Sequence, residues 1–172
     1  MRVWWTSFEL PTGLAYAAAS ESGILKLSLQ EDSRAGFIDG LYRKYGETPE
    51  ASVGPFMELV RQLAGYFDGS RREFTVPIDV RGTEFQRCVW AELLNVGYGT
   101  LTTYGRLAEK VGRPGAARAV GAAMGANNIP IIIPCHRVVA SGHGLGGYEY
   151  GLEVKRKLLA IEGALPSCGC CQ

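Results

Sequence analysis

The chain of 172 residues has little histidine and no long apolar run. The first shortage argues against a zinc site and the second against a membrane-spanning helix. It contains two histidines, His136 and His143, and no Cys-x-x-C pair lies near either, so a structural zinc site is not expected. No apolar run approaches the roughly 20 residues that a membrane-spanning helix needs. The first ten residues, MRVWWTSFEL, hold one basic side chain and an early acid, unlike a secretory signal. We therefore expect a soluble, cytoplasmic protein with no membrane partner.

Disulfide bonds are not expected either. The five cysteines are an odd number, and three of them crowd the last five residues; they occupy positions 88, 135, 168, 170 and 171. This spacing does not resemble a disulfide framework and fits free thiols in a reducing compartment. The Cys-rich tail, 166–172, could bind a soft metal or oxidise, although such a chain-end segment is more often disordered.

Charge is spread unevenly along the chain. Residues 1–80 carry 8 basic and 11 acidic side chains, a net charge of −3, whereas residues 81–172 carry 10 basic and 6 acidic side chains, a net charge of +4. An anionic partner would therefore prefer the second half, although so small an excess could also belong to a solvated face.

The first half of the chain mixes strand and helix patterns. Short apolar or alternating runs separated by Pro, Gly and Ser predict a small antiparallel sheet, and runs with apolar residues at helical spacing predict helices. The predicted strands are 3–9, 14–19, 24–29 and 73–80, and the predicted helices are 34–45 and 55–68. Because the pattern changes near 79–83, we expect one domain over 1–80 and a second over 81–165.

The second half is predicted to be mostly helical. Thr83 followed by Gln86 fits a capping box that opens the helix TEFQRCVWAELLNV. Two short helices follow at about 103–111 and 115–126, and the tight Gly-containing turn between them indicates a helix-turn-helix. The remaining predicted elements are a strand at 129–133, a glycine-rich loop at 141–151 and a helix at 152–161. The fold class is therefore α+β.

The segment IPIIIPCHRVVA, residues 129–140, places a candidate nucleophile beside a base. A cysteine reacts as its thiolate and needs a base or a positive environment, because the free thiol has a pKa of about 8.5. His136 adjoins Cys135, and Arg137 follows. Neighbours on an extended chain point to opposite sides, so a water or a turn at Pro134 would have to connect them. The competing interpretation is a buried, inert cysteine next to a surface histidine.

This segment resembles the O6-alkylguanine-DNA alkyltransferase family, the methylated-DNA–protein-cysteine methyltransferases. The likeness rests on Pro-Cys-His-Arg-Val, on GRPGAARAVGAAMGANN before it and on GLGGYEYGLEVKRKLLAIEG after it. It runs from about Phe85 to Gly163, close to half the chain. The family implies a ribonuclease-H-like N-terminal domain and a winged-helix-like C-terminal domain that carries the helix-turn-helix.

The resemblance also implies a catalytic set. In the family the motif cysteine, here Cys135, takes the alkyl group from O6 of guanine, and the motif histidine, His136, deprotonates it through a water. A glutamate matching Glu162 orients the histidine, as in other nucleophile–base–acid relays. Asn127 matches the asparagine that ties the helix-turn-helix to the active-site loop. Tyr104 matches a tyrosine that rotates the nucleotide and donates a proton toward guanine.

Residues that bind DNA and substrate are implied in the same way. Arg118 matches an arginine that fills the gap left in the base stack by the flipped nucleotide, and a helix almost bare of large side chains fits closely into the minor groove. The DNA-binding set is Arg118, Tyr104, Thr103, Arg113 and Ser141. The substrate-pocket set is Tyr148, Glu149, Val138, Pro130 and Met124.

Three features depart from the family pattern. Asn128 replaces a common proline, and Glu149 stands where many members have a small residue, so acceptance of bulky alkyl groups is open. Residues 1–80 contain no cysteine or histidine, so the N-terminal zinc site of some relatives is not expected.

GLGG at 144–147 does not follow a strand and open a helix as a phosphate loop would, and no cofactor is expected.

The expected function is the irreversible transfer of one alkyl group per protein molecule from O6-alkylguanine in double-stranded DNA to Cys135. We expect a monomer that associates with the nucleoid when it binds DNA. Two other functions stay open: a DNA-binding sensor or regulator, which would need no nucleophile, and a cysteine hydrolase, which would turn over without DNA.

Overall fold

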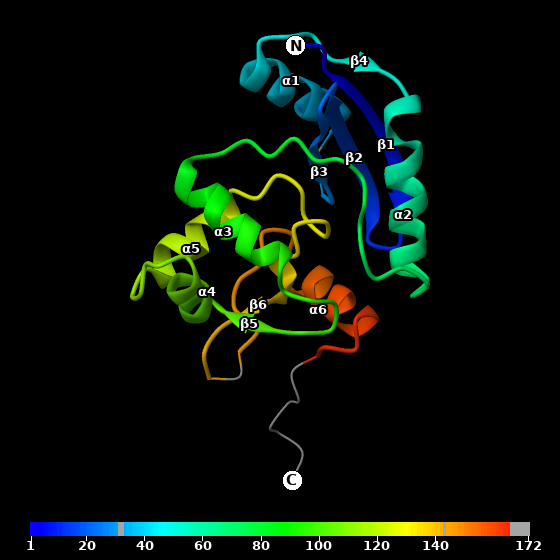
Figure 1. Cartoon of the computed structure of the whole chain (residues 1–172). Coiled ribbons are helices and arrows are strands. Elements are labelled where there is room, and N and C mark those ends of the chain that lie inside the picture. Colours follow the sequence, from blue (N-terminus) through cyan, green and yellow to red (C-terminus); the bar gives the residue numbers. More distant parts are fainter. Residues whose placement is uncertain (31–32, 143, 166–172) are drawn as a thin grey trace. The chain divides into compact units, whose positions relative to one another are not determined.

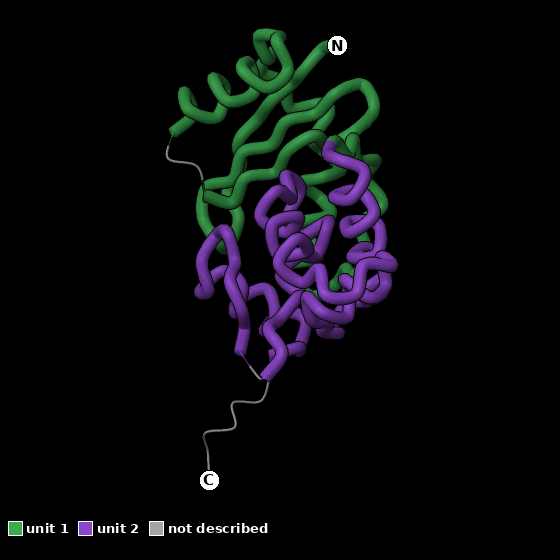
Figure 2. The backbone as a smooth tube through the Cα atoms, turned by 90° about the vertical axis from the view of Figure 1, so that its left-hand side faces the viewer, with its two compact units in different colours: residues 1–81 green, residues 82–172 purple. Residues whose placement is uncertain are grey.

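The structure, a computed structural model, describes residues 1–30, 33–142 and 144–165; the predicted Cys-rich tail, 166–172, lies outside the described residues. The chain divides into two compact units, Met1–Arg81 and Gly82–Gln172, drawn in two colours in Figure 2. The first unit holds a small sheet with helices and the second is mainly helical, so the predicted α+β class is confirmed. None of the helices in the described residues is long and apolar enough to cross a membrane.

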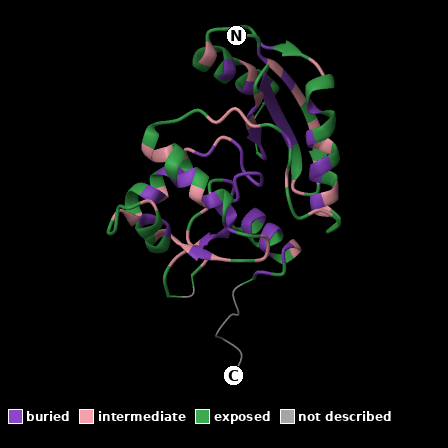
Figure 3. Cartoon of the chain, in the orientation of Figure 1, coloured by how far each residue is buried: buried purple, intermediate pink, exposed green. Residues whose placement is uncertain are grey.

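The first unit is built on a four-stranded sheet with the order β3-β2-β1-β4 (Figure 1). Its strands are β1 (Trp4–Leu10), β2 (Gly13–Ser20), β3 (Gly23–Ser28) and β4 (Glu50–Ala51). The first three form an antiparallel meander, and β4 pairs in parallel with β1. The alanine-rich β2 is the most buried strand, as expected for a central position (Figure 3).

Two helices complete this unit: α1 (Arg34–Tyr45) and, after the 3-10 turn η1 (Gly54–Phe56), α2 (Met57–Phe67). Ser33 is the N-cap residue of helix α1. Its side chain accepts a hydrogen bond from the Gly36 backbone N–H and thereby caps the first turn. Phe37 and Leu41 of α1 pack into a core with residues of β1, β2 and β3, so one helix face closes one sheet face.

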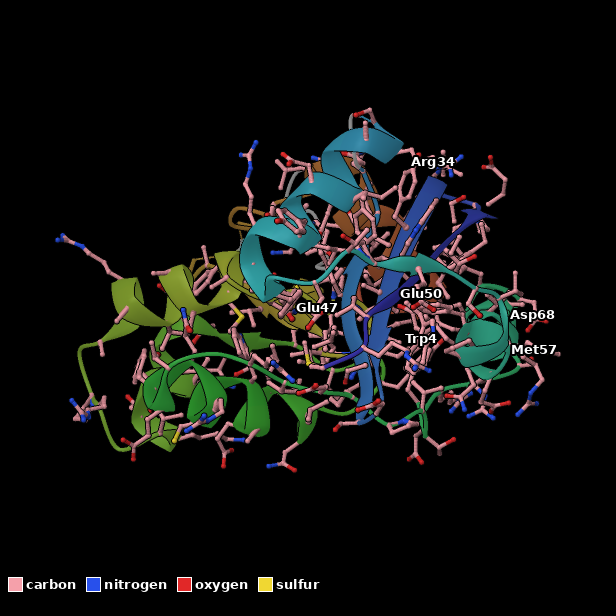
Figure 4. All side chains as sticks on the ribbon, turned by 90° about the horizontal axis from the view of Figure 1, so that it is seen from above. Trp4, Arg34, Glu47, Glu50, Met57 and Asp68 are labelled. Atoms are coloured by element: carbon pink, nitrogen blue, oxygen red, sulfur yellow. The ribbon has the colours of Figure 1, made fainter. Side chains whose placement is uncertain are left out.

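Figure 4 labels two glutamates at β4: Glu47, which precedes the strand, and Glu50, which begins it. The Glu47 carboxylate lies 3.7 Å from the N-terminal ammonium, and the Glu50 backbone N–H donates to the Val3 carbonyl. These contacts hold the segment before β4 against the beginning of β1.

The predicted strand at 73–80 is wrong. Only an isolated bridge joins Ile78 to Ile24, with hydrogen bonds from the Ile24 N–H to the Pro77 carbonyl and from the Asp79 N–H to the Ile24 carbonyl. Pro77 has no N–H to donate, so the segment cannot continue as a regular ladder.

The second unit packs α3 (Glu84–Leu94), α4 (Tyr104–Lys110), α5 (Ala117–Gly125) and α6 (Leu152–Ile161) around a short parallel pair, β5 (Thr102–Thr103) and β6 (Val138–Val139). The predicted capping box is confirmed, because Thr83 and Gln86 exchange both hydrogen bonds. The Trp90 indole N–H of α3 donates to the Ala123 carbonyl at 2.8 Å and fixes α5 against α3. Helices α4 and α5 form the helix-turn-helix.

The predicted strand at 129–133 is also wrong. The segment turns back on itself, with the Ile133 N–H donating to the Ile129 carbonyl at 2.9 Å, and Ile131 has a φ of 71°. Prolines at 130 and 134 remove two donors, and a β-branched residue in the left-handed region is strained, so the surrounding structure must hold it. The residues from 129 to 138 are all buried (Figure 3). Apolar content predicted burial here, but not conformation.

Candidate active site

Cys135 begins the 3-10 turn η2 (Cys135–Arg137), directly after the buried turn at 129–133. Its backbone N–H donates to the Ile133 carbonyl at 2.8 Å, so the chain bends sharply at Pro134. The side chain is 8% exposed. The chain therefore turns at Pro134, and the nucleophile stands at the start of a buried 3-10 turn.

Asn127 fixes this segment from the end of α5. Its side-chain N–H₂ donates to the Ile133 carbonyl at 2.9 Å and to the Cys135 Sγ at 3.2 Å, and its Oδ1 accepts from the Ile129 N–H at 2.9 Å. Because Asn127 is 3% exposed, these three bonds form away from solvent. The asparagine therefore connects the helix-turn-helix to the nucleophile, as the resemblance implied.

Glu162, which caps the C-terminal end of α6, receives hydrogen bonds from several donors. His136 Nε2 lies 2.6 Å from Oε1, and Arg137 binds both oxygens, Nε to Oε2 at 2.9 Å and Nη2 to Oε1 at 3.0 Å. The Gly99 backbone N–H donates to Oε2 at 3.1 Å. The Glu162 and His136 side chains are fully buried. A bidentate arginine next to a histidine holds the carboxylate in one orientation.

The ionisation of this cluster follows from its burial. Burial alone would raise the pKa of Glu162, but the hydrogen bonds from His136 and Arg137 outweigh it and hold the pKa at about 2. Burial lowers the pKa of His136 more than Glu162 raises it, so His136 is neutral at neutral pH. The ionised Glu162 then accepts a hydrogen bond from the Nε2–H of His136. The proton of the neutral imidazole stays on Nε2, so Nδ1 is the basic nitrogen.

Burial raises the pKa of the Cys135 thiol, while hydrogen bonds from Asn127 and Tyr148 and the positive charge of Lys155 lower it; burial prevails. The resting side chain is therefore a thiol at neutral pH. Tyr104 also has a raised pKa, from burial and from the charge that Cys135 can carry. It remains a proton donor throughout the physiological range.

Lys155 of α6 is completely buried, and the sequence interpretation gave it no role. Its Nζ donates to the carbonyls of Val138 at 2.6 Å, Leu145 at 2.5 Å and Gly147 at 3.2 Å, and burial lowers its pKa to about 8. One ammonium thus ties β6 and the 141–151 loop to α6. A sequence signal existed, since Lys155 falls on the same helix face as the buried Leu158 and Leu159.

A pocket of about 190 Å³ opens beside Cys135. Its wall consists of Tyr104 from α4, Gly121, Met124 and Gly125 from α5, and Gly147, Tyr148, Glu149 and Tyr150 from the loop before α6. Cys135 lines the same pocket, so the buried nucleophile faces a space that a small group can enter.

The pocket includes three of the five predicted wall residues, Met124, Tyr148 and Glu149. Val138 and Pro130 are buried and do not belong to this wall. Val138 pairs in β6 and gives its carbonyl to Lys155, while Pro130 lies within the turn that precedes the nucleophile. Both support the wall rather than form it.

The sequence interpretation missed the glycines of the wall. The Tyr104 ring lies close to Gly121 of α5, where an added Cβ would come 4.0 Å from two ring atoms, an ordinary contact. Gly146, just outside the wall, has a φ of 71°, and a Cβ on it would lie 3.2 Å from the Tyr104 hydroxyl. The many glycines in GAARAVGAAMG and GLGGYEYG were the available signal.

The residues predicted to bind DNA lie on or beside the helix-turn-helix. Arg118 is exposed on α5, Arg113 is exposed in the turn before it, and Thr103 caps α4 by accepting a hydrogen bond from the Arg106 N–H. Ser141 is exposed in the loop after β6. The solvent-facing residues of α5 next to Arg118 are small, and they are Ala119, Ala122 and Gly125. Such a surface can approach another backbone closely.

Metal-binding groups are few in this site. Within the ranges 1–30, 33–142 and 144–165, no three His, Cys, Asp or Glu side chains gather to hold an ion. Two buried cations lie in this part of the unit: Arg137, bound to Glu162 and to the Val96 carbonyl, and Lys155.

Comparisons with known proteins agree with this geometry. Residues 3–80 match the model of the 6-O-methylguanine DNA methyltransferase ribonuclease-like domain, and residues 84–164 match that of the DNA-binding domain of the same proteins. A methylated-DNA–protein-cysteine methyltransferase of Mycolicibacterium paratuberculosis is 42% identical over 158 residues, covering 90% of this chain and 88% of the relative. One of Methanosarcina acetivorans is 39% identical over 94% of this chain and 99% of the relative.

Solved structures give the same result. The crystal structure of Mycobacterium tuberculosis O6-methylguanine methyltransferase superimposes with a TM-score of 0.82 at 38% identity, covering 97% of this chain and 96% of that one. The crystal structure of Mycobacterium tuberculosis OGT in complex with DNA superimposes with a TM-score of 0.81 at 39% identity, covering 95% of each chain. The chain belongs to the 6-O-methylguanine DNA methyltransferase family.

Proposed function

We propose that this protein repairs DNA by direct reversal, transferring the alkyl group from O6 of guanine in double-stranded DNA to Cys135. The observation that carries the proposal is the position of Cys135. The thiol lines a small pocket next to the buried His136–Glu162 pair, on the unit that also holds the helix-turn-helix. The protein acts as a methylated-DNA–protein-cysteine methyltransferase.

The chemistry is a displacement at the alkyl carbon. The Sγ–carbon bond forms as the carbon–O6 bond breaks, and the electron pair of the broken bond stays on the guanine. His136 receives the thiol proton at Nδ1 through an intervening water, while Glu162 stabilises the imidazolium that forms. Tyr104, in the pocket wall, supplies a proton toward the guanine oxygen as it leaves. Asn127 acts as a positioning residue through its bonds to the 129–135 segment.

The product is a thioether, which water does not cleave here, because a thiolate is a poor leaving group from an unactivated alkyl carbon. Each molecule therefore reacts once. The alkyl donor is the damaged DNA itself, so the reaction requires no cofactor.

The guanine must leave the duplex to reach a buried sulfur, and unstacking costs a few kcal/mol. Arg118, exposed on α5, fills the vacated stack and offsets part of that cost. The small surface of α5 enters the minor groove, with Arg113, Thr103 and Ser141 binding the backbone around it. The net charge of +4 on residues 81–172 favours this contact.

The domain assignment is part of the proposal: 1–80 is the ribonuclease-H-like domain, 81–165 binds DNA and reacts, and 166–172 is a Cys-rich tail. We expect a cytoplasmic monomer that joins the nucleoid when it binds damaged DNA. Sedimentation of the purified protein, with and without an O6-methylguanine duplex, measures its oligomeric state.

The proton relay is tested by separating chemistry from binding. His136→Ala should slow transfer from an O6-methylguanine duplex by at least about 100-fold, the usual contribution of a general base, and leave the Kd for the duplex within about twofold. Arg156→Ala, which removes an exposed cation of α6, is the matched control and should change neither value. Equal losses of binding and transfer would remove the relay role from His136.

The two alternative functions give different results in the same assay. A damage sensor would bind the duplex without modifying Cys135, and a cysteine hydrolase would turn over an ester substrate repeatedly without DNA. The placement of Cys135 in the pocket argues against a sensor, which has no use for an oriented thiol, and the family match argues against a hydrolase.

A further inference from the structure

The pocket beside Cys135 has a wall with one formal charge at neutral pH. Of the residues that line it, only Glu149 is acidic or basic; the others are tyrosines, glycines, a methionine and the thiol itself. Glu149 is exposed to solvent at this wall. A charged substituent that enters the pocket therefore shares it with one residue of formal charge, Glu149.

The loop that carries Glu149 is held in place on both sides. Lys155 binds the carbonyls of Leu145 and Gly147 before it, and the Gly151 N–H donates to the Tyr148 carbonyl across it at 3.0 Å. Tyr148, the preceding residue, lines the same pocket as Cys135. The backbone on both sides of Glu149 is thus held at the pocket by contacts that do not depend on the Glu149 side chain.

The reaction places the alkyl substituent inside this pocket. The carbon bonded to O6 must approach Sγ in line, so any atoms attached to that carbon remain next to the sulfur. A sphere of about 190 Å³ is roughly 7 Å across, which is less than the Debye length of about 8 Å at physiological salt. A charge on the substituent and the charge on Glu149 are therefore only partly screened from each other by salt.

We propose that Glu149 selects among O6-alkylguanines by the charge of the alkyl group, so that anionic groups such as carboxymethyl are transferred more slowly than neutral ones. The proposal rests on the proposed alkyl transfer to Cys135 and adds a substrate class to it. At this separation the repulsion slows transfer of an anionic group by about tenfold relative to a neutral group of the same size.

The test uses two lesions of equal size in the same duplex, O6-carboxymethylguanine, which is anionic, and O6-carbamoylmethylguanine, which is neutral. The measured quantity is the ratio of their single-turnover rates of transfer to Cys135. The intrinsic reactivities of the two groups are the same for every variant, so they do not affect a comparison of this ratio between variants. A change in thiol ionisation alters both rates of one variant equally and leaves its ratio unchanged. Glu149→Gln removes the charge at constant size, Glu149→Asp keeps it, and Glu153→Gln removes an exposed charge from the nearby α6.

Glu149→Gln should raise the carboxymethyl-to-carbamoylmethyl ratio about tenfold, Glu149→Asp should change it by less than about threefold, and Glu153→Gln should leave it unchanged. Higher salt should raise the wild-type ratio and have less effect on Glu149→Gln. An unchanged ratio in Glu149→Gln would overturn the proposal, as would an equal rise in both lesions' rates. Failure of O6-methylguanine to modify Cys135 would instead refute the alkyl transfer itself.

Discussion

At the scale of single residues, the site combines a nucleophile that resists ionisation with a base that resists protonation. Burial raises the pKa of Cys135 and lowers that of His136, so both are neutral at rest. Moving one proton from the thiol to the imidazole creates the thiolate without any exchange with solvent. The anionic Glu162, whose pKa is about 2, stabilises the imidazolium that results.

This arrangement predicts an unusual pH profile. The thiolate–imidazolium pair holds as many protons as the thiol–imidazole pair, so the wild-type rate should be flat from about pH 7 to 8 and fall only below the usual histidine pKa of about 6.5. In His136→Ala the thiol must ionise to solvent, and the rate should rise about tenfold per pH unit. Reaction with the free base O6-benzylguanine measures both profiles without DNA binding.

The contrary outcome is equally clear. A wild-type rate that rises tenfold between pH 7 and 8, parallel to the variant, would show that His136 takes no proton from Cys135. Cys135→Ala, which has no thiol, gives the background rate for both profiles.

Glu162 also links stability to pH. Its folded pKa of about 2 lies below the ordinary value of 4.5, so its stabilising effect is complete above pH 4.5 and is lost as pH falls from 4.5 to 2. The loss of stability should be about 3 kcal/mol, the free energy that corresponds to lowering a pKa from 4.5 to about 2. Urea unfolding of wild type and Glu162→Gln should show a gap that narrows across this range. A constant gap would mean that the pKa of Glu162 is the same in the folded and unfolded states.

At the scale of elements, regular helices were predictable and tight turns were not. The predicted helix at 152–161 matches α6, and the Thr83 cap begins α3 as expected, because periodicity and capping are local properties. The segment 129–133 reads as a strand by composition. Its actual turn depends on Asn127 and on packing that forces Ile131 into the left-handed region. No local pattern encodes those contacts.

Two glycines of the first unit test how much a turn depends on its surroundings. Gly13 and Gly23 both have positive φ, 121° and 141°, but a Cβ on Gly13 meets nothing within 4 Å, whereas one on Gly23 would lie 2.4 Å from the Pro77 carbonyl oxygen. Gly13→Ala should cost about 1–3 kcal/mol from backbone strain alone. Gly23→Ala should cost about 1–3 kcal/mol more, as overpacking does.

The free energy of unfolding in urea measures both costs. Equal losses for the two variants would mean that the 77–79 segment moves away from Gly23 without penalty. The contacts of Ile24 with Pro77 and Asp79 would then contribute little to this unit.

The helix-turn-helix carries a prediction about Arg118. Arg118→Ala should slow transfer from duplex DNA by about tenfold or more, because nothing then fills the gap in the stack, and should leave the reaction with free O6-benzylguanine unchanged. Arg87→Ala on α3 is the matched control for loss of an exposed arginine. Comparable slowing on both substrates would place the role of Arg118 in the pocket rather than in the duplex.

At the scale of the whole molecule, the sequence predicted the fold class and the nucleophile but not how the site is supported. Cys135 and His136 stand out because they adjoin each other in a distinctive motif. Arg137 and Lys155 do not, because their partners are a carboxylate 25 residues away and backbone carbonyls that only the folded unit brings together. Buried cations of this kind are visible from sequence only as charges on an apolar helix face.

The most direct test of the account is the mass of the intact protein after reaction with a duplex containing one O6-methylguanine, followed by peptide mapping. The chain should gain one methyl group and no more, on the peptide that holds Cys135, and Cys135→Ala should gain none. Cys88, the other described cysteine, is exposed and should stay unmodified. A methyl group on any other cysteine, or binding of the duplex with no gain in mass, would contradict transfer to Cys135.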